Sequence, residues 1–158
     1  MPDSTTPPDD RLLAVDFGTR RVGLALGSCR DGIAVSLVTL ELGGGGVEEA
    51  VRRVADVARN EAVNRLLVGL PLNMDGSAGP AARRARAFGE KLSAAAGLPV
   101  LFLDERLTSE AARDLARQSS GGKRVKKAID DLAAVVLLQG WFDDERAREA
   151  RRRWDSAP

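Results

Sequence analysis

Three apolar segments, separated only by short turns, fill the first quarter of the chain and limit its fold more than any other feature. They span residues 12–17, 22–27 and 33–40, and the first ends at a Gly18-Thr19 turn. Segments of this length with these connections are predicted to be neighbouring antiparallel strands. The chain is therefore expected to begin with a three-stranded antiparallel meander.

The rest of the chain alternates predicted helices with predicted strands. Helices are expected over residues 47–62, 80–96, about 108–118 and 128–141, and strands over 65–70 and 99–103. Three antiparallel strands followed by α-β alternation is typical of the mixed sheet of RNase H-like domains. We therefore predict an α/β fold with a five-stranded mixed sheet, its first strand central, and helices on both faces.

The length and the two ends of the chain indicate one folded domain. A chain of 158 residues fits a single core. We predict a disordered extension over residues 1–10, the domain over 11–143 and a charged helical tail over 144–158. The start of the chain lacks the pattern of a signal peptide, and no apolar run approaches the length of a membrane span. We expect a cytoplasmic protein without a membrane partner.

Composition excludes several classes of enzyme. The chain has no histidine, which rules out serine–histidine triads, cysteine–histidine dyads and zinc–histidine sites. Its lone cysteine, Cys29, cannot form an internal disulfide and fits a reducing compartment. The net charge is +1, so a nucleic-acid site would need local clusters of positive charge. Catalysis would have to use carboxylates, Lys or Arg, hydroxyls or a hard metal ion.

Acidic residues in three segments are the candidates for such chemistry. Asp16 interrupts an apolar strand, where a carboxylate is costly to bury unless it is paired or binds a cation. Asp104 and Glu105 directly follow the last predicted strand, and Asp130 opens the last predicted helix beside its apolar stripe. Each also has an ordinary explanation: a turn acceptor for Asp16, a solvated strand end for Asp104 and Glu105, and a favourable helix dipole for Asp130.

Together these acids indicate a metal site. Carboxylates from strand one, strand five and the last helix can converge at one end of a mixed sheet. An all-oxygen cluster suits Mg²⁺ or Mn²⁺ rather than zinc. Two such ions would activate a water and stabilise the leaving oxygen in phosphodiester hydrolysis, a reaction that needs no histidine. The candidate metal ligands are Asp16, Asp104, Glu105 and Asp130.

Two polar segments are candidates for binding a polyanionic substrate. The loop Pro71–Pro80 precedes a helix N-terminus, where backbone N–H groups with Asn73 and Ser77 would bind a phosphate. The stretch Arg113–Lys127 is strongly basic, and its part from Ser119 to Lys127 is predicted to be a loop. An ordinary polar connection and a solvated basic loop are the alternatives. The substrate-binding candidates are Asn73, Ser77, Arg83, Arg86, Arg106, Lys123, Arg124, Lys126 and Lys127.

Four motifs in these segments resemble those of the YqgF/RuvX family, also described as Holliday-junction-resolvase-like and as a family of pre-16S rRNA nucleases. They are VDFGTRRVGLALG (15–27), VGLPLNMDGSAGP (68–80), FLDERLTS (102–109) and IDDLAAVVLLQGWFD (129–143). They stand in the family order and cover essentially residues 12–143.

The resemblance implies an RNase H-like fold, a divalent metal and maturation of the 5′ end of small-subunit ribosomal RNA. By position, Asp16 is the acid of the first strand, Glu105 the acid of the DER motif and Asp130 the acid of the last helix, and these three are the predicted catalytic residues. Asp104 belongs to the same motif, so the choice between it and Glu105 as a metal ligand stays open. The expected partners are nucleic acid, with RNA favoured over branched DNA, and ribosomal precursor particles.

Three other functions are compatible with parts of the sequence. The chain would cleave DNA junctions if it acted as a Holliday junction resolvase-like endonuclease. It would bind without cleaving if it were a ribosome-assembly or nucleic-acid-binding factor. An actin-like ATPase or sugar kinase shares the core and the D-x-G-T pattern of residues 16–19, but needs two such domains to enclose a nucleotide.

Overall fold

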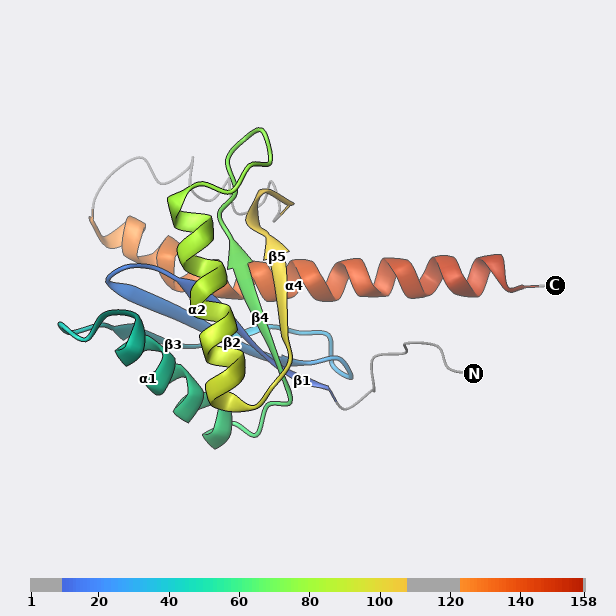
Figure 1. The fold of residues 1–158 in the computed structure, drawn as a ribbon. Coiled ribbons are helices and arrows are strands. Elements are labelled where there is room, and N and C mark those ends of the chain that lie inside the picture. The colour runs from blue at the N-terminus through green and yellow to red at the C-terminus, as the bar shows by residue number, and fades with distance from the viewer. Residues whose placement is uncertain (1–9, 108–122, 158) are drawn as a thin grey trace.

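The computed structural model describes residues 10–107 and 123–157; for residues 107 and 123–131 it describes the backbone only. Three strands come first, and strands then alternate with helices (Figure 1). The elements are β1 (Arg11–Phe17), β2 (Arg21–Ser28), β3 (Val35–Glu41), α1 (Gly46–Asn60), β4 (Arg65–Leu70), α2 (Pro80–Ala96), β5 (Val100–Asp104), the 3₁₀ helix η1 (Glu105–Leu107) and α4 (Lys123–Asp155). The helix predicted over about 108–118 lies outside the described residues.

The five strands form one mixed sheet in the order β3-β2-β1-β4-β5, with β1 at its centre as predicted. The pairs β1–β2 and β2–β3 are antiparallel, which follows from their short connections. The pairs β1–β4 and β4–β5 are parallel, and α1 and α2 supply the crossovers. The carboxyl ends of β1, β4 and β5 therefore meet at one edge of the sheet.

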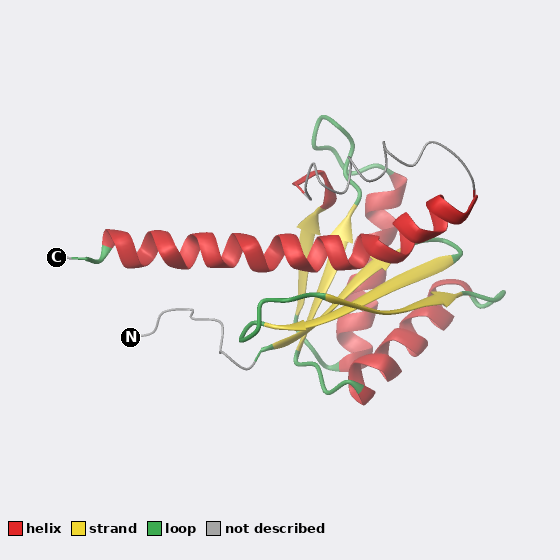
Figure 2. Cartoon of the chain, turned by 180° about the vertical axis from the view of Figure 1, so that it is seen from behind, coloured by secondary structure: helices red, strands yellow, loops and turns green. Residues whose placement is uncertain are grey.

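Helices cover both faces of the sheet, and each face has its own apolar cluster (Figures 1 and 2). Residues of β1 such as Leu13 and Val15 pack on the face covered by α1 and α2. Their neighbours Leu12 and Ala14 pack on the opposite face, against Leu138 and other residues of α4. The alternation is the period of two that a strand buried on both faces requires.

The predicted third strand begins two residues too early. The observed β3 starts at Val35, because the segment before it bonds to α4 instead of continuing the ladder. The Ala34 N–H donates to Gln139 Oε1 (3.0 Å), and Arg146 donates to the Gly32 carbonyl (2.6 Å). Gly32 also has a φ of +63°, a left-handed turn conformation that strands do not adopt.

The basic segment before the last helix is another correction. We predicted a loop as far as Lys127, but the structure starts α4 at Lys123, so Lys123, Arg124, Lys126 and Lys127 lie in its first two turns. Lys, Arg and Ala are strong helix formers, so the last helix begins before the predicted start at residue 128. At its other end α4 continues as one helix to Asp155, past the expected end at 141.

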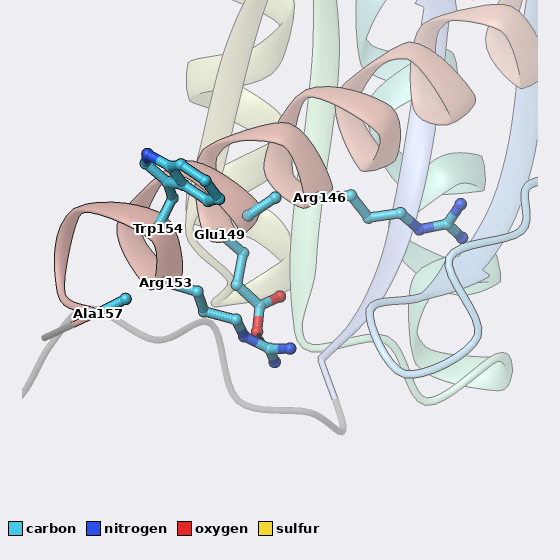
Figure 3. Close-up of a pocket in the computed structure, with 6 residues that line it drawn as sticks. Arg146, Glu149, Arg153, Trp154 and Ala157 are labelled. Carbon is cyan, nitrogen blue, oxygen red and sulfur yellow. Dashed lines mark hydrogen bonds and ion pairs between the residues drawn. The ribbon is translucent and has the colours of Figure 1, made fainter.

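The C-terminal part of α4 projects beyond the sheet (Figures 1 and 2). Exposed ion pairs between residues one turn apart support it, including Glu145–Arg148 (3.2 Å) and Glu149–Arg153 (2.6 Å). A shallow open hollow lies along this part (Figure 3). Its lining residues are Arg146, Glu149, Ala150, Arg153, Trp154 and Ala157. Among the described residues, no helix is both long and apolar enough to span a bilayer.

Candidate active site

Asp16 lies near the carboxyl end of the central strand β1, opposite Gly23 of β2. The alternation of β1 places it on the face covered by α4, two residues after Ala14. The next residue, Phe17, faces the other side and stacks on Phe88 of α2 with ring centroids 4.3 Å apart. This stacking fixes the end of β1 and thus the direction of the Asp16 side chain.

Glu105 is the first residue of η1, directly after β5. Strand β4 separates β5 from β1, and Gly69 is the β4 residue that lies between the two acids. A Cβ atom at Gly69 would be 2.9 Å from Glu105 Cγ and 3.0 Å from Glu105 Cδ. The Glu105 side chain therefore crosses β4 at a position where only glycine leaves room, and it reaches Asp16.

The carboxyl groups of Asp16 and Glu105 hydrogen-bond to each other, and this contact changes how Glu105 ionises. Burial raises the pKa of Glu105 to about 7, and the Asp16 charge, the hydrogen bond with Asp16 and the Asp104 charge add to the effect. Two carboxylates in contact repel each other unless a proton or a cation lies between them. The pair thus retains a proton up to neutral pH and has the oxygen ligands that a hard divalent cation prefers.

Asp104 has a different partner, although it stands next to Glu105 in the sequence. Its carboxylate accepts hydrogen bonds from Arg106 Nη2 (2.7 Å), Arg106 Nε (3.1 Å) and the Arg106 backbone N–H (3.0 Å). These bonds hold the pKa of Asp104 below its usual value. The two acids that the sequence could not separate therefore differ: Glu105 faces Asp16, while Asp104 is bound by Arg106.

Asp130, the third predicted catalytic acid, lies in α4, one turn before the buried Ala134. Its side chain is outside the described part of the structure, so its expected approach to Asp16 stays a prediction. Among the side chains that are described, no group of three acids or thiols is placed to hold a metal ion. The structure brings together two of the expected ligands, Asp16 and Glu105.

The loop between β4 and α2, residues 71–79, contains the predicted phosphate-binding residues and forms its own hydrogen-bond network. Asn73 Nδ2 donates to Ser77 Oγ (3.0 Å), and the Ser77 backbone N–H and hydroxyl both donate to Asp75 Oδ1 (2.9 and 2.6 Å). Arg106 Nη1 donates to the Met74 carbonyl (3.1 Å) and ties the loop to η1. Asn73 and Ser77 thus shape the loop, and their phosphate binding remains a prediction.

The structure describes the side-chain contacts of only some of the basic candidates. Arg83 is bonded to the Ala78 carbonyl (2.9 Å), and Arg86 lies 4.8 Å over the Phe102 ring, an ordinary cation–π contact. Arg106 is engaged by Asp104 and Met74. The side chains of Lys123, Arg124, Lys126 and Lys127 are not described. Substrate binding by these residues stays a prediction.

Sequence reasoning did not find Gly69 as part of the site. The signal was present: a glycine in the strand RLLVGL weakens the strand and commonly marks a close approach of another group. What approaches it could not be inferred, because the approach depends on β5 lying next to β4.

The fold gives the class of protein. The mixed sheet with β1 at its centre is that of RNase H-like proteins. Thermus thermophilus RuvC has the same fold, with a TM-score of 0.56 and 13% identity over 87% of this chain and 96% of that chain. The same protein in complex with a Holliday junction substrate gives a TM-score of 0.57 at 15% identity. At this identity the likeness concerns the fold alone.

Sequence comparison then gives the family. Residues 10–144 match the family model described as "RuvX: Holliday junction resolvase". A protein of Anaeromyxobacter dehalogenans is 44% identical over 136 residues, which is 84% of this chain and 96% of that protein. One of Pelotomaculum thermopropionicum is 38% identical over 85% of this chain and 88% of its own length. Both are named "Putative pre-16S rRNA nuclease". The chain belongs to the RuvX family, as its motifs predicted.

Proposed function

We propose that this chain is a divalent-metal-dependent nuclease that hydrolyses phosphodiester bonds in precursor 16S ribosomal RNA near its 5′ end. The observation that carries the proposal is the contact of Asp16 with Glu105 at the edge where three parallel strands end. The printed name of the relatives supports RNA as the substrate. The protein would encounter this RNA within ribosomal precursor particles.

The residues of the site fit Mg²⁺ or Mn²⁺. Asp16 and Glu105 supply adjoining carboxylate oxygens, and Asp130 would add a third from the start of α4. When bound, such ions activate the attacking water and stabilise the leaving oxygen. Asp16 and Glu105 would hold the ion through their carboxylate oxygens, and Glu105 would lose its proton when it binds the ion. Asp104 and Arg106 fix the backbone of η1 that carries Glu105.

Cleavage of three matched substrates tests the proposal: an RNA that spans the 5′ precursor junction of 16S rRNA, DNA of the same sequence, and a four-way DNA junction. We expect cleavage of the RNA with Mg²⁺ or Mn²⁺ and none in EDTA. Asp16→Asn should abolish turnover, because the amide keeps the shape but loses the charge. Asp56→Asn is the control, since Asp56 is an exposed acid on α1 that pairs with Arg59.

Each alternative function predicts a different result of this cleavage experiment. Preferential cleavage of the four-way junction would assign branched DNA as the substrate and keep the chemistry. Metal-independent binding without any cleavage would identify a non-catalytic nucleic-acid-binding factor. Undiminished cleavage by Asp16→Asn would contradict the proposed site.

A further inference from the structure

Met74 is the most exposed large apolar side chain among the described residues, with 90% of its surface accessible. It lies in the loop of residues 71–79, which joins β4 to α2 and projects from the edge of the sheet where β4 and β5 end (Figures 1 and 2). An isolated exposed apolar residue needs no explanation on an ordinary surface. Met74 differs because its backbone carbonyl is bonded to Arg106, the residue that follows Glu105.

The loop that carries Met74 is held in one shape by its own hydrogen bonds. The Asn73 N–H donates to the Ser77 carbonyl (2.9 Å), and the Gly76 N–H donates to the Asn73 carbonyl (2.8 Å). Asp75 turns its carboxylate inward to Ser77, and Gly76 has a φ of +87°, which favours glycine. The polar groups of the loop point into the loop itself, and Met74 is left outside.

Arg106 connects this loop to the acid pair. Its Nη1 donates to the Met74 carbonyl (3.1 Å), while its Nη2 and Nε bind Asp104. Arg106 directly follows Glu105 in η1. One guanidinium group thus links the Met74 backbone to the segment that carries Glu105, and the exposed Met74 side chain lies on a loop that is bonded to this segment.

We propose that Met74 is a wedge that inserts between two bases of the nucleic acid whose backbone lies at the Asp16–Glu105 pair. A thioether side chain has no strong hydrogen-bonding group and is flexible and polarisable, so it can replace one base in contact with another. Proteins that kink or unstack nucleic acids use apolar side chains of this kind, methionine among them. The chain would then act where stacking is interrupted, at the boundary between a stem and a single strand.

This inference rests on the proposed nuclease function, and it is tested with the full chain and two substrates. One is an RNA with an intact stem next to the cleavage position; the other has an abasic residue there, so that its stack is already broken. The variants are Met74→Ala, Met74→Gln as a polar residue of similar length, and Met74→Leu as the conservative change. Val35→Ala, which shortens another exposed apolar residue on the distant strand β3, is the control.

On the intact stem, Met74→Ala and Met74→Gln should lose on the order of ten- to a hundredfold in kcat/KM, because the unstacking energy is no longer supplied by the protein. Met74→Leu should retain most of the activity. The abasic substrate should restore Met74→Ala to nearly the wild-type rate. An equal loss on both substrates, or no loss on either, would overturn the wedge.

A binding experiment separates this inference from the nuclease proposal. The intact RNA carries 2-aminopurine at the 5′ precursor junction of 16S rRNA, and the protein is added in EDTA. Fluorescence should rise with the wild-type chain as the base unstacks, and it should not rise with Met74→Ala. A rise without any cleavage when metal is restored would support the wedge and refute the nuclease. Equal fluorescence with both proteins would refute the wedge even if cleavage is observed.

Discussion

The carboxyl groups of Asp16 and Glu105 hydrogen-bond to each other across strand β4, at the position of Gly69. Asp16 comes from β1 and Glu105 from η1 directly after β5, and these two strands do not pair with each other in the sheet. Two acids in contact are unfavourable for stability once both are charged. Their arrangement therefore fits a binding site for a cation. The ionisation of Glu105 and the geometry of the acid pair can be tested separately.

The raised pKa of Glu105 predicts how the stability of the metal-free protein depends on pH. The pKa of Glu105 is about 7 in the folded protein, whereas that of an unfolded glutamic acid is 4.5. The folded state therefore binds more protons between these values. The contribution to stability is complete below pH 4.5 and declines by about 3 kcal/mol as pH rises to 7.

Urea unfolding in EDTA at several pH values between 4.5 and 8 measures this decline. Glu105→Gln removes the titrating group and should show less loss of stability over the same range. Parallel curves of stability against pH for the wild type and Glu105→Gln would contradict the assignment of this pKa to Glu105.

Metal binding should depend on the same proton. Mg²⁺ or Mn²⁺ should bind more tightly as pH rises through 7, with release of a proton, because a cation needs the charged carboxylate.

Gly69→Ala should impair the site without unfolding the protein. The added Cβ would collide with the Glu105 side chain and push its carboxyl group away from Asp16. We expect a loss of ten- to a hundredfold in cleavage rate, comparable to the effect of misplacing groups that orient metal ligands. Gly44→Ala is the matched control, because a Cβ there meets no atom within 4 Å. Full activity of Gly69→Ala with an unchanged melting temperature would show that Glu105 need not cross β4.

Arg106→Lys should weaken cleavage although it keeps the positive charge. The guanidinium group of Arg106 binds Asp104 through two nitrogens and the Met74 carbonyl through a third. A lysine cannot reproduce this fork. We expect a loss of about tenfold in kcat/KM, on the scale of one charge-assisted hydrogen bond. The same experiment with Arg53→Lys, whose guanidinium binds Glu49 and the Glu41 carbonyl away from the site, should leave cleavage unchanged.

Much of the fold followed from local patterns in the sequence. The strand 65–70 and the helix 80–96 were predicted with their observed bounds, because Pro71 and Gly97 mark their ends. The central place of β1 followed from the order of elements. The predicted start of β3 was wrong, because the observed start depends on Gln139 and Arg146 from a helix more than a hundred residues away. Local propensity carries no information about such contacts.

The sequence marked Asp16 and Glu105 as candidates, but it did not show how their side chains are arranged. Asp16 was marked by its apolar neighbours, which is a local signal. The choice between Asp104 and Glu105 depends on which of them the arginine at 106 binds and on the gap left by Gly69. Both facts arise only when β5 pairs with β4, so the sequence left them open.

The basic residues at the start of α4 give the last prediction. Lys123, Arg124, Lys126 and Lys127 lie in the first two turns of the helix that also carries Asp130. Cations there would meet backbone phosphates of a bound strand, and every such contact releases counterions. Replacing all four by Ala should flatten the slope of log affinity against log salt by about 0.7 per lost contact for a single-stranded RNA. Saturating turnover should change little, because none of the four is a proposed metal ligand.

The same helix offers a control of equal charge at its other end. Arg148, Arg151, Arg152 and Arg153 lie near the C-terminal end of α4, and their replacement by Ala also removes four charges. If the start of α4 binds the substrate, the first variant should lose salt dependence and the second should lose much less. Alanine keeps both segments helical, so circular dichroism should not distinguish the two proteins. Equal slopes for both would mean that only overall charge matters, and the path of the nucleic acid would then have to be sought around Asn73, Arg83 and Arg86.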